Sequence, residues 1–166
     1  GVLAMKMSSI RDNTIGATLL KFVEGSNAQT PRATLAFALT GLGIQRDPKY
    51  ESVLIKFATD DSLNPWWAWV KRGAINGLAE LRTEEAMNTL LKLAPDGAIP
   101  YFSGLRATRV AIMFALGNVC YWMNPQTRDR VAFFLAQILR DDHDYFVRKA
   151  AASALSNLGD TAHAYK

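Results

Sequence analysis

Hydrophobic positions along this chain recur with the three- and four-residue spacing of amphipathic helices. No segment alternates strictly between apolar and polar residues as a β-strand does. Four short aliphatic stretches, each followed by an acidic or glycine-containing turn, predict the first helices of four helix pairs. These stretches are Leu19–Phe22, Leu54–Phe57, Leu90–Leu93 and Leu135–Ile138. The pattern therefore predicts an all-α fold of about four helix hairpins.

The expected second helices repeat at a nearly constant interval. Each contains a basic residue, a small residue six positions later, a leucine at the seventh position and an aliphatic residue at the tenth. The basic residues, which follow one another at steps of 39, 38 and 39, are Arg32, Lys71, Arg109 and Arg148. A fixed period of this length is typical of α-solenoids, whose units bury their apolar faces against their neighbours. The corresponding leucines, which we expect at equivalent buried positions, are Leu39, Leu78, Leu116 and Leu155.

The spacing also sets the expected organisation of the chain, a single repeat domain over residues 13–166. The repeats cover about residues 13–44, 45–82, 83–121 and 122–160. Residues 1–12 are expected to be a lead-in or a partial helix, and residues 161–166 the start of a further helix or a tail. Gly43 and Gly159 stand where glycine often ends a helix. We therefore expect second helices to end at these glycines.

The fourth repeat carries a recognisable family pattern. Between Asp142 and Asp160 it has an Asp six residues before an Arg, a Val-Arg pair, a run of alanines and a closing Leu-Gly-Asp. This pattern resembles a HEAT repeat, and the resemblance covers roughly residues 14–166, weakening toward the first repeat. Repeats two to four are also similar to the carboxy-terminal HEAT-like domains of gluzincin aminopeptidases and their inactive relatives. The resemblance implies a right-handed α-α superhelix of the HEAT or armadillo kind. It also implies that the chain is a fragment or a carboxy-terminal domain of a larger protein.

The sequence also departs from the HEAT pattern. The position six residues before the basic residue is an acid only in the fourth repeat, where it is Asp142. In the first three repeats it is Ser26, Pro65 and Ser103. An Asp–Arg ladder along the turns is therefore expected to be incomplete, with the first three basic residues lacking this partner. The zinc motif of the aminopeptidases, His-Glu-x-x-His, does not occur, so the resemblance implies no peptidase chemistry here.

Composition and charge add modest constraints. The chain has 166 residues, of which 49% are hydrophobic, with 19 Lys and Arg against 15 Asp and Glu. No apolar run approaches the ~20 residues that cross a bilayer, and no signal peptide is recognisable at the amino end. The single cysteine, Cys120, permits no internal disulfide. These features favour a cytoplasmic protein that does not contact membranes.

Residues with catalytic or metal-binding chemistry do not form a convincing group in the sequence. His143 lies between two aspartates in a turn, but a metal site needs three or four converging ligands. Cys120 has no neighbouring histidine and is expected to be a buried, inert thiol. We therefore predict that the chain is not an enzyme and holds no metal or cofactor.

Two groups of residues remain as candidate binding sites. The first is the row of basic residues on the second helices, spaced by ~8–10 Å in a regular solenoid, which Arg72, Arg106 and Lys149 would widen. These side chains either grip an acidic peptide or a phosphate backbone, or bond to carboxylates and carbonyls in the turns. The second group lies before the second helix of repeat two and comprises Trp66, Trp67 and Trp69. These tryptophans either fix the turn to the core or leave an exposed aromatic anchor for a partner.

Two functions are consistent with these features. The first is a non-catalytic protein-interaction scaffold, whose second helices bind a protein, a peptide or the remainder of the same polypeptide. The alternative is nucleic-acid binding, because HEAT-like DNA glycosylases also carry tryptophans and basic residues on such a surface. That family places a catalytic Asp among its tryptophans, and no Asp lies between Trp66 and Trp69 here.

Overall fold

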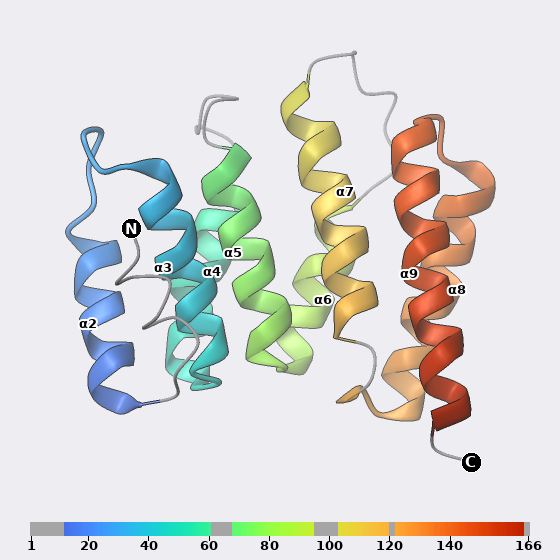
Figure 1. The fold of residues 1–166 in the computed structure, drawn as a ribbon, viewed down its shortest axis with the longest axis horizontal. Helices are drawn as coiled ribbons and strands as arrows, with labels where there is room; N and C mark the ends of the chain where they lie inside the picture. Colours follow the sequence, from blue (N-terminus) through green and yellow to red (C-terminus); the bar gives the residue numbers. More distant parts are fainter. Residues whose placement is uncertain (1–11, 61–67, 95–102, 120–121, 165–166) are drawn as a thin grey trace. The chain divides into compact units, whose positions relative to one another are not determined.

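A computed structural model of the protein describes residues 12–60, 68–94, 103–119 and 122–164 (Figure 1). Within these ranges the chain is helical and contains no strand, which confirms the predicted all-α fold. The α-helices are α2 (Asn13–Glu24), α3 (Arg32–Ile44), α4 (Glu51–Thr59), α5 (Ala68–Leu81), α6 (Glu84–Leu93), α7 (Ser103–Asn118), α8 (Pro125–Asp141) and α9 (Tyr145–Ala164). A 3-10 helix, η1 (Pro48–Tyr50), precedes α4.

The chain forms two compact units, one over residues 1–89 and the other over residues 90–166. Helix α6 crosses the boundary between them. Unit 1 therefore contains α2 to α5, and unit 2 contains α7 to α9. The predicted first helices correspond to α2, α4, α6 and α8, and the predicted second helices to α3, α5, α7 and α9.

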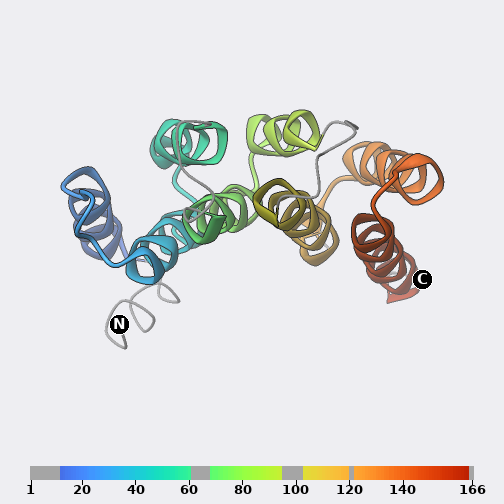
Figure 2. The ribbon, with the colours of Figure 1, turned by 90° about the horizontal axis from the view of Figure 1, so that it is seen from above.

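In unit 1, the second helices form the centre of the packing. Helix α3 packs against α5, α2 packs against α3, and α4 packs against α5 (Figure 2). The aliphatic side chains that meet between these helices, including Leu39, Leu54 and Leu78, are fully buried. Burying one such side chain contributes about 1.5–3 kcal/mol, so the contact between helices, more than helix propensity, stabilises this unit.

Small residues let the backbones of α3 and α5 touch. A Cβ on Gly43 would overlap the backbone of Gly77, and a Cβ on Gly73 would overlap the backbone of Ala36. Thr40 adds a hydrogen bond across the contact, because its hydroxyl donates to the carbonyl oxygen of Gly73 at 3.1 Å. The two helices therefore approach more closely than leucine-lined helices can.

The prediction that second helices end at glycine is wrong. Gly43 lies inside α3, and α9 continues through Gly159 to Ala164, so the predicted break before residue 161 does not occur. Left-handed backbone conformations are instead adopted by Arg46 (φ 56°) and Arg82 (φ 66°), just beyond α3 and α5. Gly43 is required for the close helix contact and not for a helix end.

Unit 2 is built from α7, α8 and α9, with α9 packed against both of the others. Asn124 caps the start of helix α8, because its side chain accepts a hydrogen bond from the amide of Thr127 at 2.8 Å. Pro125 follows at the first helical position, where no amide donor is needed. The buried residues at the core of this unit include Leu116 and Leu135.

The leucines of the repeat are not equally buried. Leu39, Leu78 and Leu116 are fully buried, as predicted, whereas Leu155 is only half-buried. On α9, Ala154 and Leu158 are the buried residues of that turn. The prediction is therefore confirmed for three of the four positions and wrong for Leu155.

Gly43→Ala should destabilise unit 1 by about 1–3 kcal/mol, because the added methyl group overlaps backbone that cannot move freely. Gly159→Ala is the matched control, since nothing lies within 4 Å of its added Cβ. Replacing this helical glycine by alanine should leave the free energy of unfolding unchanged or raise it by up to about 1 kcal/mol. Chemical denaturation of both variants measures the difference, and equal stability would contradict the packing role of Gly43.

Leu116→Ala should lower the free energy of unfolding by about 2–5 kcal/mol, because it opens a cavity in a fully buried site. Leu155→Ala removes the same atoms from a half-buried site and should cost clearly less. Denaturant titrations of the two variants provide the comparison. A larger loss for Leu155→Ala would mean that the burial described for α9 is wrong.

Candidate functional site

An exposed tryptophan and an arginine stack on each other at the start of α5. Trp69 is 58% exposed, which is unusual for so large an apolar side chain. The guanidinium carbon of Arg72 lies over its ring, 4.3 Å from the ring centroid. The two residues are three positions apart and so share one face of the helix. This cation–π pair holds an aromatic surface and a positive charge together in solvent.

Phe37 of α3 faces the same region and is 39% exposed. Between α3 and α5 lies a small pocket of about 60 Å³. The pocket is lined by Ala33, Ala36, Phe37, Thr40, Trp69, Arg72, Gly73 and Asn76. Its volume is far below the ~300–1,000 Å³ of sites for small molecules and cofactors. A single apolar side chain of a partner suits it better.

The close packing of the two helices explains why these large side chains are exposed. Ala36 and Gly73 occupy the contact itself, and Phe37 and Arg72 are their immediate neighbours in sequence. Because the backbones touch at the small residues, the larger neighbours project beside the contact. The same packing that stabilises unit 1 therefore leaves a shallow groove with aromatic borders.

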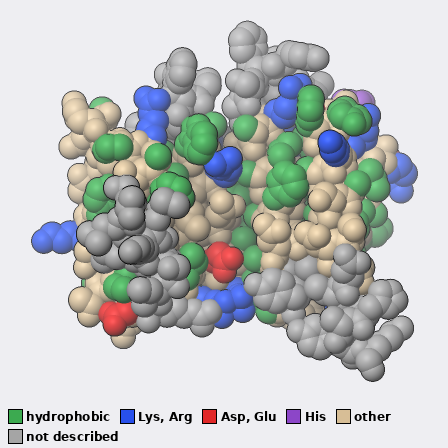
Figure 3. Space-filling view, viewed as in Figure 1, with side chains coloured by type: hydrophobic (Ala, Val, Ile, Leu, Met, Phe, Trp, Pro, Cys, Tyr) green, Lys and Arg blue, Asp and Glu red, His purple; other side chains and the backbone are tan. Residues whose placement is uncertain are grey.

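Charge is distributed unevenly between the helices. The second helices contain Arg32, Lys71, Arg72, Arg106, Arg109, Arg148 and Lys149, but only Glu80 and Asp160 as acidic residues. The first helices carry acidic and basic residues in equal number. Figure 3 shows hydrophobic and basic side chains near the upper ends of α5 and α9, with little acidic surface. Partners of negative charge are therefore favoured at the second helices.

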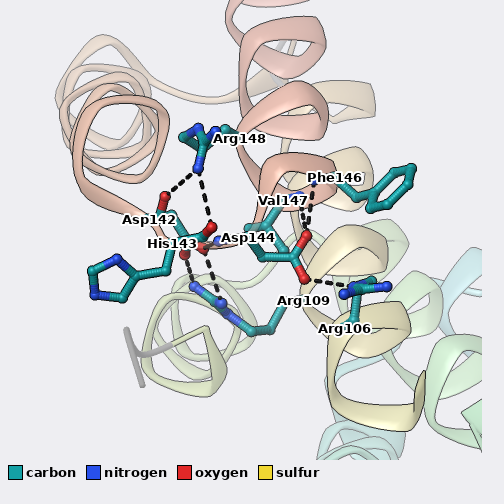
Figure 4. A network of polar contacts seen from close by, with 8 residues as sticks. All are labelled: Arg106, Arg109, Asp142, His143, Asp144, Phe146, Val147 and Arg148. Atoms are coloured by element: carbon teal, nitrogen blue, oxygen red, sulfur yellow. Dashed lines mark hydrogen bonds and ion pairs between the residues drawn. The ribbon is translucent and has the colours of Figure 1, made fainter. Parts of the chain in front are cut away.

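In unit 2, a network of polar contacts joins α7 to the turn between α8 and α9 (Figure 4). Arg109 is 4% exposed and forms a two-pronged ion pair with the carboxylate of Asp142, which is also buried. Breaking a buried pair of this kind by removing one partner commonly costs 3–5 kcal/mol. The role of Arg109 is therefore to hold the turn against α7.

Arg148 completes the turn from the other side. Its Nη1 donates to the carbonyl oxygens of Asp142 at 2.8 Å and His143 at 3.1 Å. The expectation that Arg109 lacks this Asp partner is wrong, because the carboxylate of Asp142 pairs with it. The acid of the fourth repeat pairs with the arginine of the preceding repeat, while the arginine of its own repeat bonds to backbone.

Asp144 caps α9 and meets α7 at the same time. Its Oδ1 accepts hydrogen bonds from the amides of Phe146 at 2.8 Å and Val147 at 3.4 Å, and its Oδ2 accepts from Nε of Arg106 at 2.5 Å. Burial raises the pKa of this carboxyl, but the hydrogen bonds from Arg106 and the two amides outweigh it. The pKa of Asp144 therefore lies below the usual aspartate value.

The structure separates the predicted basic row into different roles. Arg32 is exposed at the start of α3, Lys71 and Arg148 are half-buried, and Arg109 is buried. The alternative that these residues are turn partners is confirmed for Arg109 and Arg148. Among the predicted tryptophans, Trp69 is exposed, whereas Trp66 and Trp67 lie outside the described residues, as does Cys120.

Sequence reasoning missed Phe37. It lies five residues after Arg32, immediately before the small position of the repeat. A phenylalanine recurs at the same position of the third repeat, as Phe114, and this recurrence was the available signal.

Metal chemistry and membrane insertion find no support in the part of the chain that the structure describes. No group of three or more His, Cys, Asp or Glu side chains there is arranged to hold a metal ion. The carboxylates on either side of His143 are engaged by Arg109 and Arg106. None of the described helices combines the length and the apolar character that crossing a bilayer requires.

In comparisons with known proteins, no family model matches this sequence, and no curated protein matches it.

Asp144→Asn should weaken unit 2 at neutral pH and not at acid pH. Asparagine still accepts hydrogen bonds at a helix start, so the substitution mainly removes the charge that faces Arg106. Because the folded-state pKa of Asp144 is lowered, its charge stabilises the fold above the pKa of an unfolded aspartate. That contribution is lost as the pH falls through the folded-state pKa.

Thermal unfolding at a series of pH values should therefore show a lower unfolding midpoint for Asp144→Asn than for wild type at neutral pH. This difference should begin to narrow only as the pH falls below about pH 4. Asp129→Asn, which changes an exposed carboxylate on α8, is the control and should leave the midpoint nearly unchanged. A gap that stays constant down to low pH would show that the charge of Asp144 does not matter.

Proposed function

We propose that this protein is a non-catalytic protein-interaction module whose second helices bind a segment of a partner protein. The observation that carries the proposal is the small pocket between α3 and α5, with Phe37 and Trp69 exposed beside it and Arg72 stacked on the tryptophan. Tryptophan and arginine are enriched among the residues that dominate protein–protein binding energies. An apolar pocket of this size suits one anchoring side chain.

The proposal includes a HEAT-like right-handed solenoid in which the second helices line one surface. It is supported by the regular spacing of the second helices in the sequence and, within each unit, by the packing of α3 on α5 and of α7 on α9. Such arrays act by presenting a surface and require no catalytic group. The partner is either a separate protein or another part of a longer polypeptide, such as an aminopeptidase-like protein.

Nucleic-acid recognition is the second candidate function, favoured by the excess of basic residues on the second helices. It would need these cations to contact phosphates. Arg109 is buried against Asp142, and Arg148 bonds to backbone carbonyls in a turn. Because the structure uses these two arginines internally, protein binding is the better-supported function.

Selection of short random peptides on the full chain tests the proposal. We expect the enriched peptides to share a bulky apolar side chain that fits the pocket. Their affinity should fall about tenfold or more for Trp69→Ala, because this change removes the main aromatic anchor. The control is Phe22→Ala, which also truncates an exposed aromatic side chain but lies on the first helix α2, away from the pocket. Phe22 is exposed to about the same degree as Phe37, so this variant also serves as the match for Phe37→Ala.

Two results would contradict the proposal. Peptides that bind Trp69→Ala and Phe37→Ala as tightly as wild type would show that this groove is not the binding surface. Tight binding of a DNA or RNA duplex that falls steeply with salt, and is lost in Arg72→Glu, would favour the nucleic-acid function instead.

A further inference from the structure

The exposed groove residues of unit 1 have counterparts in unit 2. Phe37, Trp69 and Arg72 are each followed, 77 residues further along the sequence, by a residue of the same kind. These counterparts are Phe114, Phe146 and Lys149. The interval equals two repeats, so each set combines an aromatic residue on one second helix with an aromatic and a basic residue on the next.

The side chains of the two sets are also exposed to solvent to a similar degree. Phe114 is 45% exposed, close to the value for Phe37, and Phe146 is 55% exposed, close to the value for Trp69. Lys149 and Arg72 are both exposed. Leaving a large aromatic side chain in water forgoes the few kcal/mol that its burial would contribute. A shared use of these positions explains the coincidence.

The helices that carry the two sets also pack in the same way. Helix α7 packs against α9 as α3 packs against α5. A Cβ on Gly117 of α7 would lie only 2.8 Å from the Cβ of Ala154, so small residues bring these helices close together as well. In both units an arginine guanidinium stacks on the aromatic ring, Arg72 on Trp69 and Arg106 on Phe146, the latter at 5.2 Å from the ring centroid.

We infer that each unit carries one docking site for the same kind of ligand, a segment of a partner protein in which a bulky apolar side chain stands next to Asp or Glu. This inference rests on the proposed function and adds to it the class of ligand and the number of sites. The apolar side chain contacts the paired aromatics, Phe37 with Trp69 or Phe114 with Phe146. The carboxylate pairs with Arg72 in unit 1 and with Lys149 in unit 2.

Charge complementarity selects this ligand over a neutral or basic one. Glu80 is the only acidic residue among the described side chains of the second helices. It lies toward the carboxyl end of α5, whereas Trp69 and Arg72 lie at the start of that helix. In unit 2, the carboxylates of the turn before α9, Asp142 and Asp144, are already paired with Arg109 and Arg106. Lys149 therefore supplies the exposed positive charge beside Phe146.

The test uses the ¹⁵N-labelled full chain and the synthetic peptide Glu-Glu-Leu-Trp-Glu-Glu, followed by NMR, which detects weak binding. We expect amide shift changes in two groups, around the starts of α5 and α9, with two peptides bound per chain at saturation. Arg72→Glu should remove the first group and leave the second, and Lys149→Glu should do the reverse. Lys56→Glu, a reversal of an exposed charge on the first helix α4, is the matched control.

Aromatic substitutions separate the two sites from general charge effects. Phe146→Ala should remove the second group of shifts, whereas Phe133→Ala, at an exposed phenylalanine of the first helix α8, should not. The peptide Lys-Lys-Leu-Trp-Lys-Lys should produce neither group. The spectrum of each variant without peptide shows whether its fold is retained.

Shifts confined to the start of α5, with no effect of Phe146→Ala or Lys149→Glu, would overturn the second site while leaving the proposed function intact. Equal shifts with the basic peptide would overturn the charge selection. If the acidic peptide causes no shifts although peptides selected on the chain bind at Trp69, the ligand class is wrong and the interaction function stands.

Discussion

Backbone contact between neighbouring second helices is the constraint on which the rest of unit 1 depends. Glycine or alanine on both sides of the α3–α5 contact lets the two helices touch, and Thr40 spans it with a hydrogen bond to the carbonyl oxygen of Gly73. This approach seals the leucine core on one side of the contact. On the other side it places Phe37 and Arg72 beside a narrow groove. Stability and the candidate binding surface thus share one origin.

In unit 2, a network of ion pairs and hydrogen bonds supplements the same kind of helix contact. The turn between α8 and α9 contains three consecutive polar residues and would be poorly fixed by apolar packing alone. Arg109 from α7 and Arg148 from α9 bond to the turn from two sides, and Asp144 caps α9 while meeting Arg106. A buried charge such as that of Arg109 is tolerated because a carboxylate of opposite charge is paired with it. The turn and α7 are consequently positioned together.

Helix identity was predictable because it depends on local periodicity, whereas helix contacts were not. Gly43 gave a local signal for a helix end, but its actual role depends on Gly77, which belongs to the next second helix. Arg109 looked like a surface cation because its partner, Asp142, is 33 residues away. The exposure of Trp69 followed from neither composition nor spacing. For Gly43 and Arg109 the deciding interaction joins residues from different repeats, which a single repeat does not reveal.

The buried ion pair also sets how this protein responds to its ionic environment. Arg109 and Asp142 are removed from water, where dissolved ions screen charges over about 8–10 Å at physiological ionic strength. Arg72 and Lys149 are exposed and are fully subject to that screening. Concentrated salt would thus release the proposed acidic partner from the second helices long before it loosened the turn of unit 2. Assembly would become reversible under conditions in which the architecture persists.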